Sequence, residues 1–419
     1  MRGGEGSGGL CALRTLHVSS GGERSAGVGG TAYGLLVPFA MTLTRPNSVL
    51  HAVVGVRVVN RLGGFGMSFL GLRLARDLGM SLGAVGLVLA VFGACTIPSR
   101  ILGGVLATRL GTRPTIIGGL LVCAAALFAI GLADTVPVVV AAVLCLGLAY
   151  ELIEPATQAV IAETIDPARQ ASAFALLWST LSVAGVVSGL LAALLGRWGV
   201  SAIFVCDAVS SVLAAGAAVV LLPSARAERH PSPWRAALTP RLIAWTGVGT
   251  VYATLVMIIV FMLPLAVDAA GHTTSTTGWL LAVAAAAAIA AQRLLRRTEL
   301  RMPPATALVL GHLVLAAGLG LWATGHFAGL LGGAVLEGAS GAFLLGTYQA
   351  RAAAMGGPGL GAAVMTVFGL SWGVATVVAP LVGAPLLAHG DATLWLTCAG
   401  LSLALALGHA ATRRPSASG

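Results

Sequence analysis

Charged side chains are scarce in this sequence, and lysine is absent. Charged residues make up 9% of the 419 residues, and all 24 basic residues are arginine, whereas a soluble domain usually carries about 25% charged residues. Hydrophobic residues make up 57% of the chain, which is more apolar surface than a soluble fold can cover with polar side chains. The composition therefore excludes an ordinary soluble domain and indicates helices that are covered by lipid.

Aromatic residues are also few, at 5% of the chain, and no stretch alternates them with basic residues. The net charge of +10 would otherwise favour a nucleic-acid partner. Most arginines instead lie in short gaps between apolar runs, where the positive-inside bias of membrane proteins places them. We therefore expect the lipid bilayer, and no nucleic acid, as a partner.

The motifs of enzymes and metal sites are missing. The six cysteines form no CxxC pair and five lie within apolar segments, so they are interpreted as small hydrophobic residues. The GxSxG, HExxH and phosphate-binding glycine motifs are absent as well. We expect no enzymatic activity, no metal and no cofactor, and a process driven by a gradient or by diffusion rather than by ATP hydrolysis within this chain.

Residues 1–47 are rich in glycine and serine and show no hydrophobic periodicity, which predicts a disordered tail. Met41 lies just before the first long apolar segment. One hypothesis is that translation starts at Met41 and that residues 1–40 are an extension of the gene model. N-terminal mass spectrometry that finds Arg2 or Glu5 in the mature protein would contradict this hypothesis.

Long apolar segments follow one another through the rest of the chain. A membrane-spanning helix needs about 20 apolar residues, and the pattern predicts an all-α polytopic membrane protein with twelve transmembrane helices. The predicted helices are residues 51–72, 81–102, 115–133, 136–158, 171–195, 201–222, 242–266, 276–295, 305–323, 327–348, 361–387 and 391–410.

The longest polar gap, residues 223–240, divides these helices into six plus six. We expect an N-terminal six-helix bundle at residues 48–222, a cytoplasmic central loop, a C-terminal six-helix bundle at 241–411 and a cytoplasmic tail at 412–419. Two six-helix halves joined by one loop are typical of transporters built from parallel repeats.

A weak internal repeat supports the six-plus-six division. At an offset of 191 residues, Gly147 matches Gly338 and Gln158 matches Gln349. This offset equals the spacing between the fourth and the tenth predicted helix, as a duplicated bundle requires.

The arginines of the connecting segments predict the orientation. With both termini in the cytoplasm, Arg73, Arg76 and Arg197 fall on the outer side, and the other arginines of the connections fall on the inner side. We expect a monomer in the plasma membrane with both termini cytoplasmic.

The connection after the second predicted helix reads Gly104-Val-Leu-Ala-Thr108-Arg109-Leu-Gly111-Thr-Arg113. It resembles the Gly-x-Leu-Ala-Asp-Arg-x-Gly-Arg-Arg loop of the major facilitator superfamily, with Thr108 in the place of the family's aspartate. The glycines allow a tight turn. The resemblance implies that the arginines lie at the inner membrane interface, where they can pair with acids of the opposing bundle.

Helices 4 to 6 resemble the macrolide-efflux and siderophore-export branches of this superfamily, through Glu154-Pro155-Ala-Thr-Gln158 and through Asp207 in helix 6. Drug:proton antiporters of the superfamily usually carry a Gly-Pro step in helix 5, where this chain reads Val187-Ser188-Gly189. The resemblance implies two pseudo-symmetric six-helix bundles and secondary transport of a small molecule. It also favours Asp207 as an anchor between helices.

Two arginines lie one turn apart on the same face of the first predicted helix. A charged group at membrane depth costs about 2.5–3.5 kcal/mol on insertion scales, so each is a functional candidate. Two interpretations of Arg57 and Arg61 stay open. They face a water-filled cavity, where they attract an anionic group or hold an acid of helix 4, or they extend to the inner membrane interface.

Glu151 and Glu154 lie three residues apart in the inner half of helix 4, which places both on one face of a continuous helix. We expect Glu151, the deeper one, to neutralise an arginine of helix 1 or to take a proton. For Glu154 we favour an interfacial pair with Arg109 or Arg113, which would act as a closing latch.

Glu337 lies in the middle of helix 10 and is the only acid deep in the second half. A lone carboxylate in apolar surroundings can load and release a proton, so Glu337 ranks first as a proton or cation site. The alternative is a structural hydrogen bond to a neighbouring helix.

Several uncharged residues are further candidates. Gln349 and Tyr252 could line the substrate pathway, although helix–helix contacts and core packing explain them as well. Gly185 and Gly189 form a small-xxx-small pair in helix 5, at which the two bundles would rock against each other. His312 is interpreted as a satisfied polar group.

The resulting hypothesis is a secondary transporter that exports a drug-like or metabolite substrate by alternating access, with proton coupling through Glu337 and Glu151. One alternative is an importer or a uniporter, which would keep working when the proton gradient collapses. The other is a transport-inactive membrane scaffold or sensor, which the missing motif aspartate at Thr108 favours slightly.

Overall fold

The computed structural model describes residues 48–165, 167–223, 235, 238–297, 302–356 and 360–411, and these residues form helices and short connections without a β-strand. The expectations for the N-terminal tail, for most of the central loop and for residues 412–419 lie outside the described residues. The all-α expectation is confirmed.

The helices follow the predicted segments closely. The first six crossings, called the N-terminal half below, are α2 (Ser48–Gly63), α3 (Gly66–Leu72), the π-helix η1 (Arg73–Asp77), α4 (Leu82–Arg109), α5 (Thr112–Leu132), α6 (Val136–Tyr150), α7 (Ile153–Thr164), α8 (Pro167–Leu195), the short η2 (Gly196–Trp198) and α9 (Val200–Leu221). The last six, called the C-terminal half, are α11 (Pro240–Ala269), α12 (Thr274–Arg297), α13 (Pro304–Trp322), α14 (Phe327–Ala353), α15 (Gly361–Ala388) and α16 (Asp391–Ala411).

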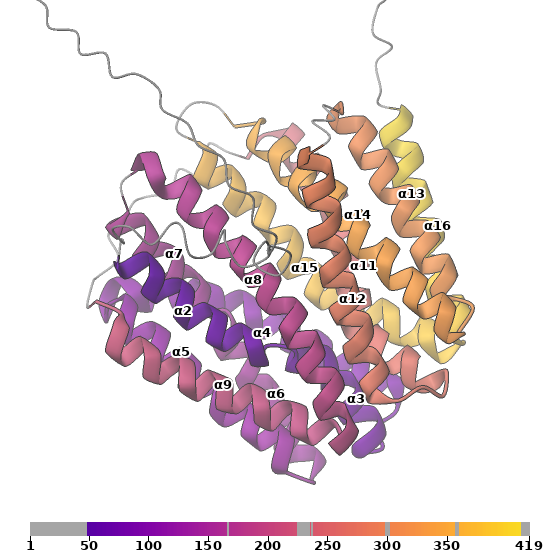
Figure 1. The fold of residues 1–419 in the computed structure, drawn as a ribbon, viewed down its shortest axis with the longest axis horizontal. Helices are drawn as coiled ribbons and strands as arrows, with labels where there is room; N and C mark the ends of the chain where they lie inside the picture. Colours follow the sequence, from indigo (N-terminus) through magenta and orange to yellow (C-terminus); the bar gives the residue numbers. More distant parts are fainter. Residues whose placement is uncertain are drawn as a thin grey trace, which may run out of the picture. The chain divides into compact units, whose positions relative to one another are not determined.

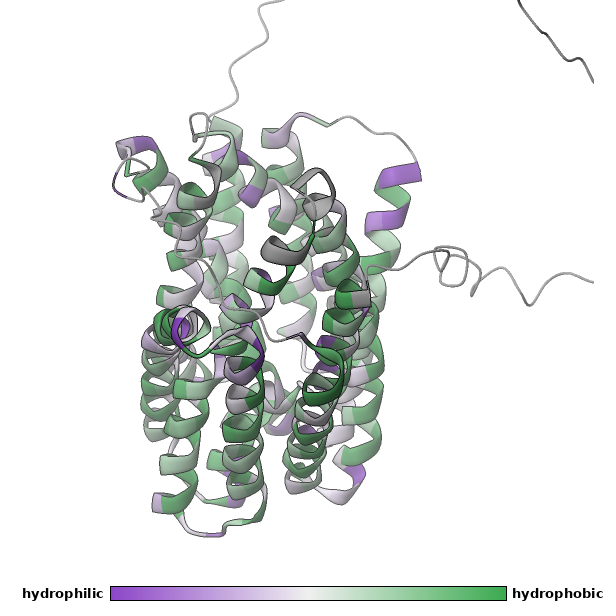
Figure 2. Ribbon diagram, turned by 90° about the vertical axis from the view of Figure 1, so that its left-hand side faces the viewer, coloured by the Kyte–Doolittle hydropathy of each residue, from purple (hydrophilic) through white to green (hydrophobic). Residues whose placement is uncertain are grey.

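Eleven helical segments in the described part of the chain are long and apolar enough to cross a membrane, with α6 and α7 together forming one of them. Figure 2 shows hydrophobic residues along most of each helix. The remaining predicted span, residues 51–72, is present but divided into α2 and α3. The break contains Gly63, Gly64 and Gly66, and each glycine weakens a helix interior by about 1 kcal/mol.

Each half packs mainly within itself, and three helix pairs make most of the contacts between the halves. In the N-terminal half, α5 and α2 pack on α9; in the C-terminal half, α13 packs on α14 and α16, and α11 packs on α15. The connecting pairs are α4 with α15, α8 with α12 and α3 with α11. Figure 1 shows α2, α5, α6 and α9 on one side, α13, α14 and α16 on the other, and α8 beside α12 between them.

Close glycine contacts recur at equivalent positions of the two halves. A Cβ atom on Gly147 of α6 would lie 2.8 Å from the carbonyl oxygen of Phe92 in α4. Gly338 of α14 approaches the carbonyl oxygen of Ala284 in α12 in the same way. The offsets are 338 − 147 = 191 and 284 − 92 = 192 residues, so the repeat seen in the sequence is also a repeat of packing.

The same relationship holds for contacts between the halves. Gly86 of α4 packs against Ala384 of α15, where an added Cβ atom would lie 2.8 Å from the alanine Cβ. Gly278 of α12 packs against the backbone of Ala193 in α8. The offsets are 384 − 193 = 191 and 278 − 86 = 192 residues. The two connecting interfaces are therefore copies of each other, as expected for parallel repeats related by a pseudo-two-fold axis.

The two halves meet toward one end of the helices. This end, called the distal end below, holds the connections at residues 78–81, 133–135, 270–273 and 389–390. There Arg76 forms an ion pair across the halves, and α3 packs against α11, whereas α2, at the opposite or proximal end of the same crossing, packs against α7, α8 and α9. The first crossing thus connects to the C-terminal half through its distal part.

Candidate functional site

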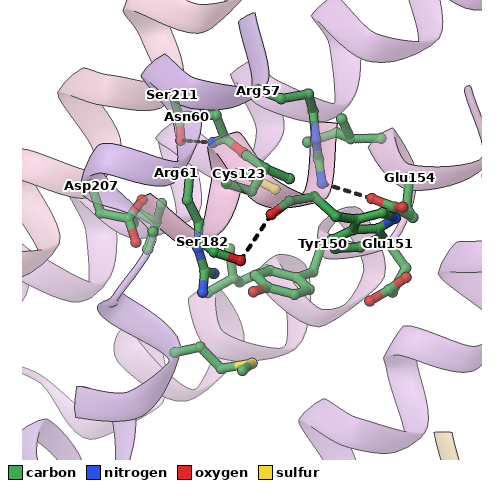
Figure 3. Close-up of a pocket in the computed structure, with 17 residues that line it drawn as sticks. Arg57, Asn60, Arg61, Cys123, Tyr150, Glu151, Glu154, Ser182, Asp207 and Ser211 are labelled. Carbon is green, nitrogen blue, oxygen red and sulfur yellow. Dashed lines mark hydrogen bonds and ion pairs between the residues drawn. The ribbon is translucent and has the colours of Figure 1, made fainter. Parts of the chain in front are cut away.

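A cavity of about 340 Å³ lies inside the N-terminal half, and its lining is unusually polar for a membrane-spanning bundle (Figure 3). Every lining residue comes from α2, α3, α5, α6, α7, α8, α9 or the breaks between them. The polar lining residues are Arg57, Asn60, Arg61, Tyr150, Glu151, Glu154, Ser182, Asp207 and Ser211. The size falls within the range of small-molecule sites.

The break in the first crossing opens onto this cavity. The Phe65 amide donates to the Gly63 carbonyl at 2.7 Å, which is a tight turn rather than a helical bond. Asp207 Oδ2 of α9 accepts the Gly66 amide at 3.1 Å and so satisfies a backbone donor that the break leaves free. Asp207 therefore joins helix 6 to helix 1, in the geometry expected of an anchor, and it also lines the cavity.

Glu154 pairs with an arginine of the first crossing. Arg57 Nη2 donates to Glu154 Oε2 at 2.6 Å, and both side chains are more than four-fifths buried. Gln158 Nε2 donates to the other carboxylate oxygen at 3.0 Å, so Gln158 orients the acid. The expected pair of Glu154 with Arg109 or Arg113 is wrong. Arg57 of α2 faces the start of α7 across the cavity and forms the ion pair with Glu154 instead.

Glu151 lies where the fourth crossing breaks. Pro155 has no amide hydrogen to donate to the Glu151 carbonyl four residues earlier, and the chain leaves α6 at Tyr150 and re-enters a helix at Ile153. Ser99 Oγ of α4 accepts the Glu151 amide at 3.1 Å. The two acids consequently do not share the face that a continuous helix would give them.

The carboxylate of Glu151 turns toward α4 instead of toward helix 1. Arg100 Nη1 lies 3.5 Å from Glu151 Oε2, with side chains 52% and 27% exposed. The expected neutralisation of Arg57 or Arg61 by Glu151 is therefore replaced by a looser pair with Arg100. Sequence reasoning missed Arg100 because its contact depends on how the broken fourth crossing turns toward α4.

Arg61 has neither a hydrogen-bond nor an ion-pair partner for its guanidinium among the described residues. Figure 3 shows Arg61 extending into the cavity between Ser182 and Tyr150, while Arg57 bonds to Glu154 and Asn60 to Ser211. The hydroxyl of Tyr150 is likewise without a partner in the part of the chain that the structure describes. Among the described residues, the Arg61 guanidinium and the Tyr150 hydroxyl are thus both unused in the cavity, and Arg57 Nε is a buried donor that also lacks a hydrogen bond.

Glu337 does not line this cavity. It lies within α14 in the C-terminal half, where neighbouring Gly338 packs against α12. Its carboxylate makes no hydrogen bond or ion pair with the described residues, so the structural hydrogen bond considered as an alternative is not formed there. The structure therefore brings Arg57, Glu154 and Asp207 together in one half and leaves Glu337 in the other.

The motif residues after helix 2 occupy two different places. Gly111 has φ +105°, which favours glycine, and makes the turn between α4 and α5. Gly104 lies inside α4 with open space around it, so the tight turn expected of it is made by Gly111 alone. Arg113 donates to the carbonyl of Val219 in α9, and Arg109 is exposed at the end of α4.

The glycine pair of helix 5 also divides. A Cβ atom on Gly189 would lie 2.6 Å from the Ala282 backbone nitrogen in α12, whereas Gly185 faces open space. Of the two glycines expected at the contact between the bundles, Gly189 makes a close contact with the other half and Gly185 does not. Gln349 is half-buried in α14.

Tyr252 is buried in the C-terminal half, where its ring stacks on Tyr348 with centroids 4.7 Å apart. Tyr348 is the centre of a buried hydrogen-bonded chain. Its hydroxyl lies 2.9 Å from His312 Nε2 and 2.8 Å from His409 Nε2. His312 Nδ1 lies 3.2 Å from Ser402 Oγ. The chain connects α13, α14 and α16, and its four polar members share no sequence motif by which it could have been predicted.

The partners define the direction of this chain. Ser402 Oγ donates its hydrogen to the His312 carbonyl at 2.9 Å. The same oxygen therefore accepts a hydrogen bond from Nδ1–H of the His312 ring. A neutral imidazole then has an acceptor at Nε2, to which Tyr348 donates, and the Tyr348 oxygen accepts from His409. Every group that faces Tyr348 in this chain is satisfied, which identifies His312 as part of a brace between helices.

The long apolar helices and the charged cavity among them define the class of polytopic α-helical membrane proteins. Residues 53–380 match the family model described as Major Facilitator Superfamily. The chain belongs to this superfamily of transporters. Within the described residues, no group of three or more His, Cys, Asp or Glu side chains is placed to hold a metal ion.

Curated relatives carry the name multidrug resistance protein MdtH. The one from Aeromonas hydrophila is 28% identical over 272 residues, which cover 61% of this chain and 66% of the relative. The one from Yersinia enterocolitica is 28% identical over 221 residues, which cover 51% of this chain and 55% of the relative. The matched region thus spans 66% or less of the length of these relatives.

Solved structures share the fold. The nucleoside transporter NupG superposes with a TM-score of 0.72 at 12% identity and covers 87% of this chain and 100% of that chain. A structure from a study of proton dependent oligopeptide transporters gives a TM-score of 0.67 at 15% identity, with coverages of 87% and 97%. At these identities the similarity shows the fold alone.

Proposed function

We propose that the chain is a secondary active transporter that exports a drug-like or metabolite substrate across the plasma membrane by alternating access, coupled to protons. The observation that carries the proposal is the charged cavity within membrane-crossing helices. The two halves of the protein are in contact at the distal end, as a transporter closed on one side requires. Relatives named for multidrug resistance favour export of drug-like compounds.

The halves are proposed to move as two bodies, residues 48–222 and 241–411, in a monomer. The positive-inside rule favours a cytoplasmic proximal end, since Arg109, Arg113 and Arg241 lie there. In that orientation the described conformation is closed toward the outside and both termini are cytoplasmic.

Glu337 is the proposed proton carrier. Its carboxylate lies deep in a crossing helix and has no partner among the described residues, and such a group is costly in lipid unless it serves a function. Glu151 is a secondary candidate, because its pair with Arg100 is long and partly exposed. Gln349 and Tyr252 lie in the same half as Glu337 and are proposed as parts of its pathway.

The test is accumulation of lipophilic and zwitterionic compounds in an efflux-deficient host, with and without a protonophore. Wild type should lower accumulation, and Glu337→Gln and the protonophore should each abolish this effect. Asp391→Asn, which removes an acid at the start of α16, is the matched control and should behave as wild type. Full activity of Glu337→Gln would exclude Glu337 as the coupling group.

Other outcomes favour the alternatives. Uptake that survives the protonophore would indicate an importer or a uniporter. Membrane expression without any effect on the panel would favour a scaffold or sensor over an exporter of these compounds.

A further inference from the structure

Arg61 is the guanidinium of the cavity that the protein itself leaves unused. The other charges of the lining are engaged: Arg57 with Glu154 at 2.6 Å, Glu151 with Arg100 at 3.5 Å, and Asp207 with the Gly66 amide at 3.1 Å. Asp207 faces the same cavity without forming an ion pair with Arg61. The five N–H donors of Arg61 are therefore available to a ligand.

The depth of Arg61 argues against an extension to the membrane interface. It lies 13 residues after Ser48, the first residue of α2, which corresponds to roughly 20 Å of helix at 1.5 Å per residue. Toward the other end, the crossing continues through α3 and η1 to Asp77. An arginine side chain reaches neither end from there, so the charge lies in the cavity.

The surroundings of Arg61 fit one kind of ligand. The Tyr150 hydroxyl lies on the same cavity and has no partner in the described part of the chain, so it offers a second donor (Figure 3). Trp178 also lines the cavity and is 53% exposed. A guanidinium forms paired hydrogen bonds with a carboxylate, and aromatic walls favour a flat apolar body.

We propose that Arg61 and Tyr150 form an anion subsite that binds the carboxylate of an aromatic or similarly apolar organic acid. This inference rests on the proposed function, since it names the substrate class of the transporter. Arg57 is not part of the subsite, because it donates to Glu154, whose other carboxylate oxygen accepts from Gln158.

The test is equilibrium binding to the purified full-length protein in lipid nanodiscs, where no gradient is needed. The probes are 1-naphthoate and its uncharged analogue 1-naphthamide. Wild type should bind naphthoate at least tenfold more tightly than naphthamide. Arg61→Gln should remove this preference and leave the affinity for naphthamide unchanged, and Tyr150→Phe should weaken naphthoate binding a few-fold.

Arg197→Gln is the matched control, because Arg197 is exposed at the distal end outside the cavity; it should bind naphthoate as wild type does. If Arg61→Gln does not fold, Arg61→Lys serves instead: it keeps the charge, loses the paired geometry and should bind naphthoate with an intermediate loss. Equal binding of both probes by wild type, no binding of either, or an unchanged affinity in the Arg61 variant would overturn the subsite. Export of other compounds in the accumulation assay would stand in each case, so the two proposals fail separately.

Discussion

Arg76 Nη1 lies 3.3 Å from Asp268 Oδ1 and joins the two halves of the protein at their distal end. The same nitrogen donates to Thr274 Oγ1 at 2.9 Å, so one arginine of the first crossing holds the start of α12 and the end of α11. The side chains are 37% and 35% exposed. An ion pair of this exposure contributes about 0.2–1 kcal/mol, which makes it a latch that thermal motion can open.

Replacing this latch should shift the conformational balance. The reporter is a cysteine placed in the cavity by Ser182→Cys, in a protein without its native cysteines. In this protein, Arg76→Gln should increase labelling of the reporter from the distal side. The expected increase is up to about fivefold, from the free energy of an exposed pair. Labelling by a membrane-impermeant maleimide measures it.

The control for the latch is Arg197→Gln, which removes an exposed arginine at the same end that forms no ion pair with the described residues of the other half. The charge-swapped protein with Arg76→Asp and Asp268→Arg should recover most of the wild-type protection. Equal labelling of wild type and Arg76→Gln would show that the pair plays no part in closure.

Breaking the Arg57–Glu154 pair should destabilise the N-terminal half more than removing it entirely. Glu154→Gln leaves the guanidinium of Arg57 unpaired in a largely buried place, at a cost of about 1–3 kcal/mol, below the 3–5 kcal/mol of a fully buried pair. The protein with both Arg57→Gln and Glu154→Gln should regain much of this loss. Thermal unfolding in detergent of the four proteins of this cycle measures the coupling; additive losses would contradict it.

The two glycines of helix 5 should respond differently to the same change. Gly189→Val forces a side chain into the backbone of Ala282 and should separate α8 from α12, so that the distal end opens and maleimide labelling of the cavity rises. Gly185→Val places the same side chain in open space and should label as wild type does. Similar labelling of both variants would mean that this interface does not hold the distal end closed.

The buried chain around Tyr348 should contribute to stability rather than to transport. Tyr348→Phe removes the hydroxyl that connects His312 and His409, and each buried group left without its partner costs about 1–3 kcal/mol. Tyr252→Phe is the control, because its hydroxyl makes no hydrogen bond with the described residues. A lower melting temperature only for Tyr348→Phe is expected; equal melting temperatures would mean that the hydroxyl braces nothing.

The positions of the helices could be predicted because lipid imposes a simple requirement on them. A crossing must be long and apolar, and the last predicted helix, residues 391–410, differs from α16 (Asp391–Ala411) by a single residue. The breaks in the first and fourth crossings were not predicted, since glycine and proline are tolerated in membrane helices when neighbours satisfy the freed backbone groups. Those neighbours, Asp207 and Ser99, are distant in the sequence.

The members of the cavity could be predicted as charged residues at depth, but their partners could not. Arg57, Arg61, Glu151 and Glu154 all line it, yet which arginine meets which acid depends on the break after Tyr150. A continuous helix would have kept the acids on one face. Because the break was not predicted, the spacing of the residues could not show that Arg57 is paired and that Arg61 is not.

The paired contacts Gly86–Ala384 and Gly278–Ala193 also decide how abruptly this protein can change shape. The two halves are in contact at two symmetric interfaces. Rotation of one half about one interface strains the other interface, so both interfaces must separate together. Close-packed surfaces of this kind have two stable arrangements and little between them. Under the proposed alternating access, the duplicated interface would switch between two packed arrangements, so that the cavity would open to one side of the membrane or the other and rarely to both.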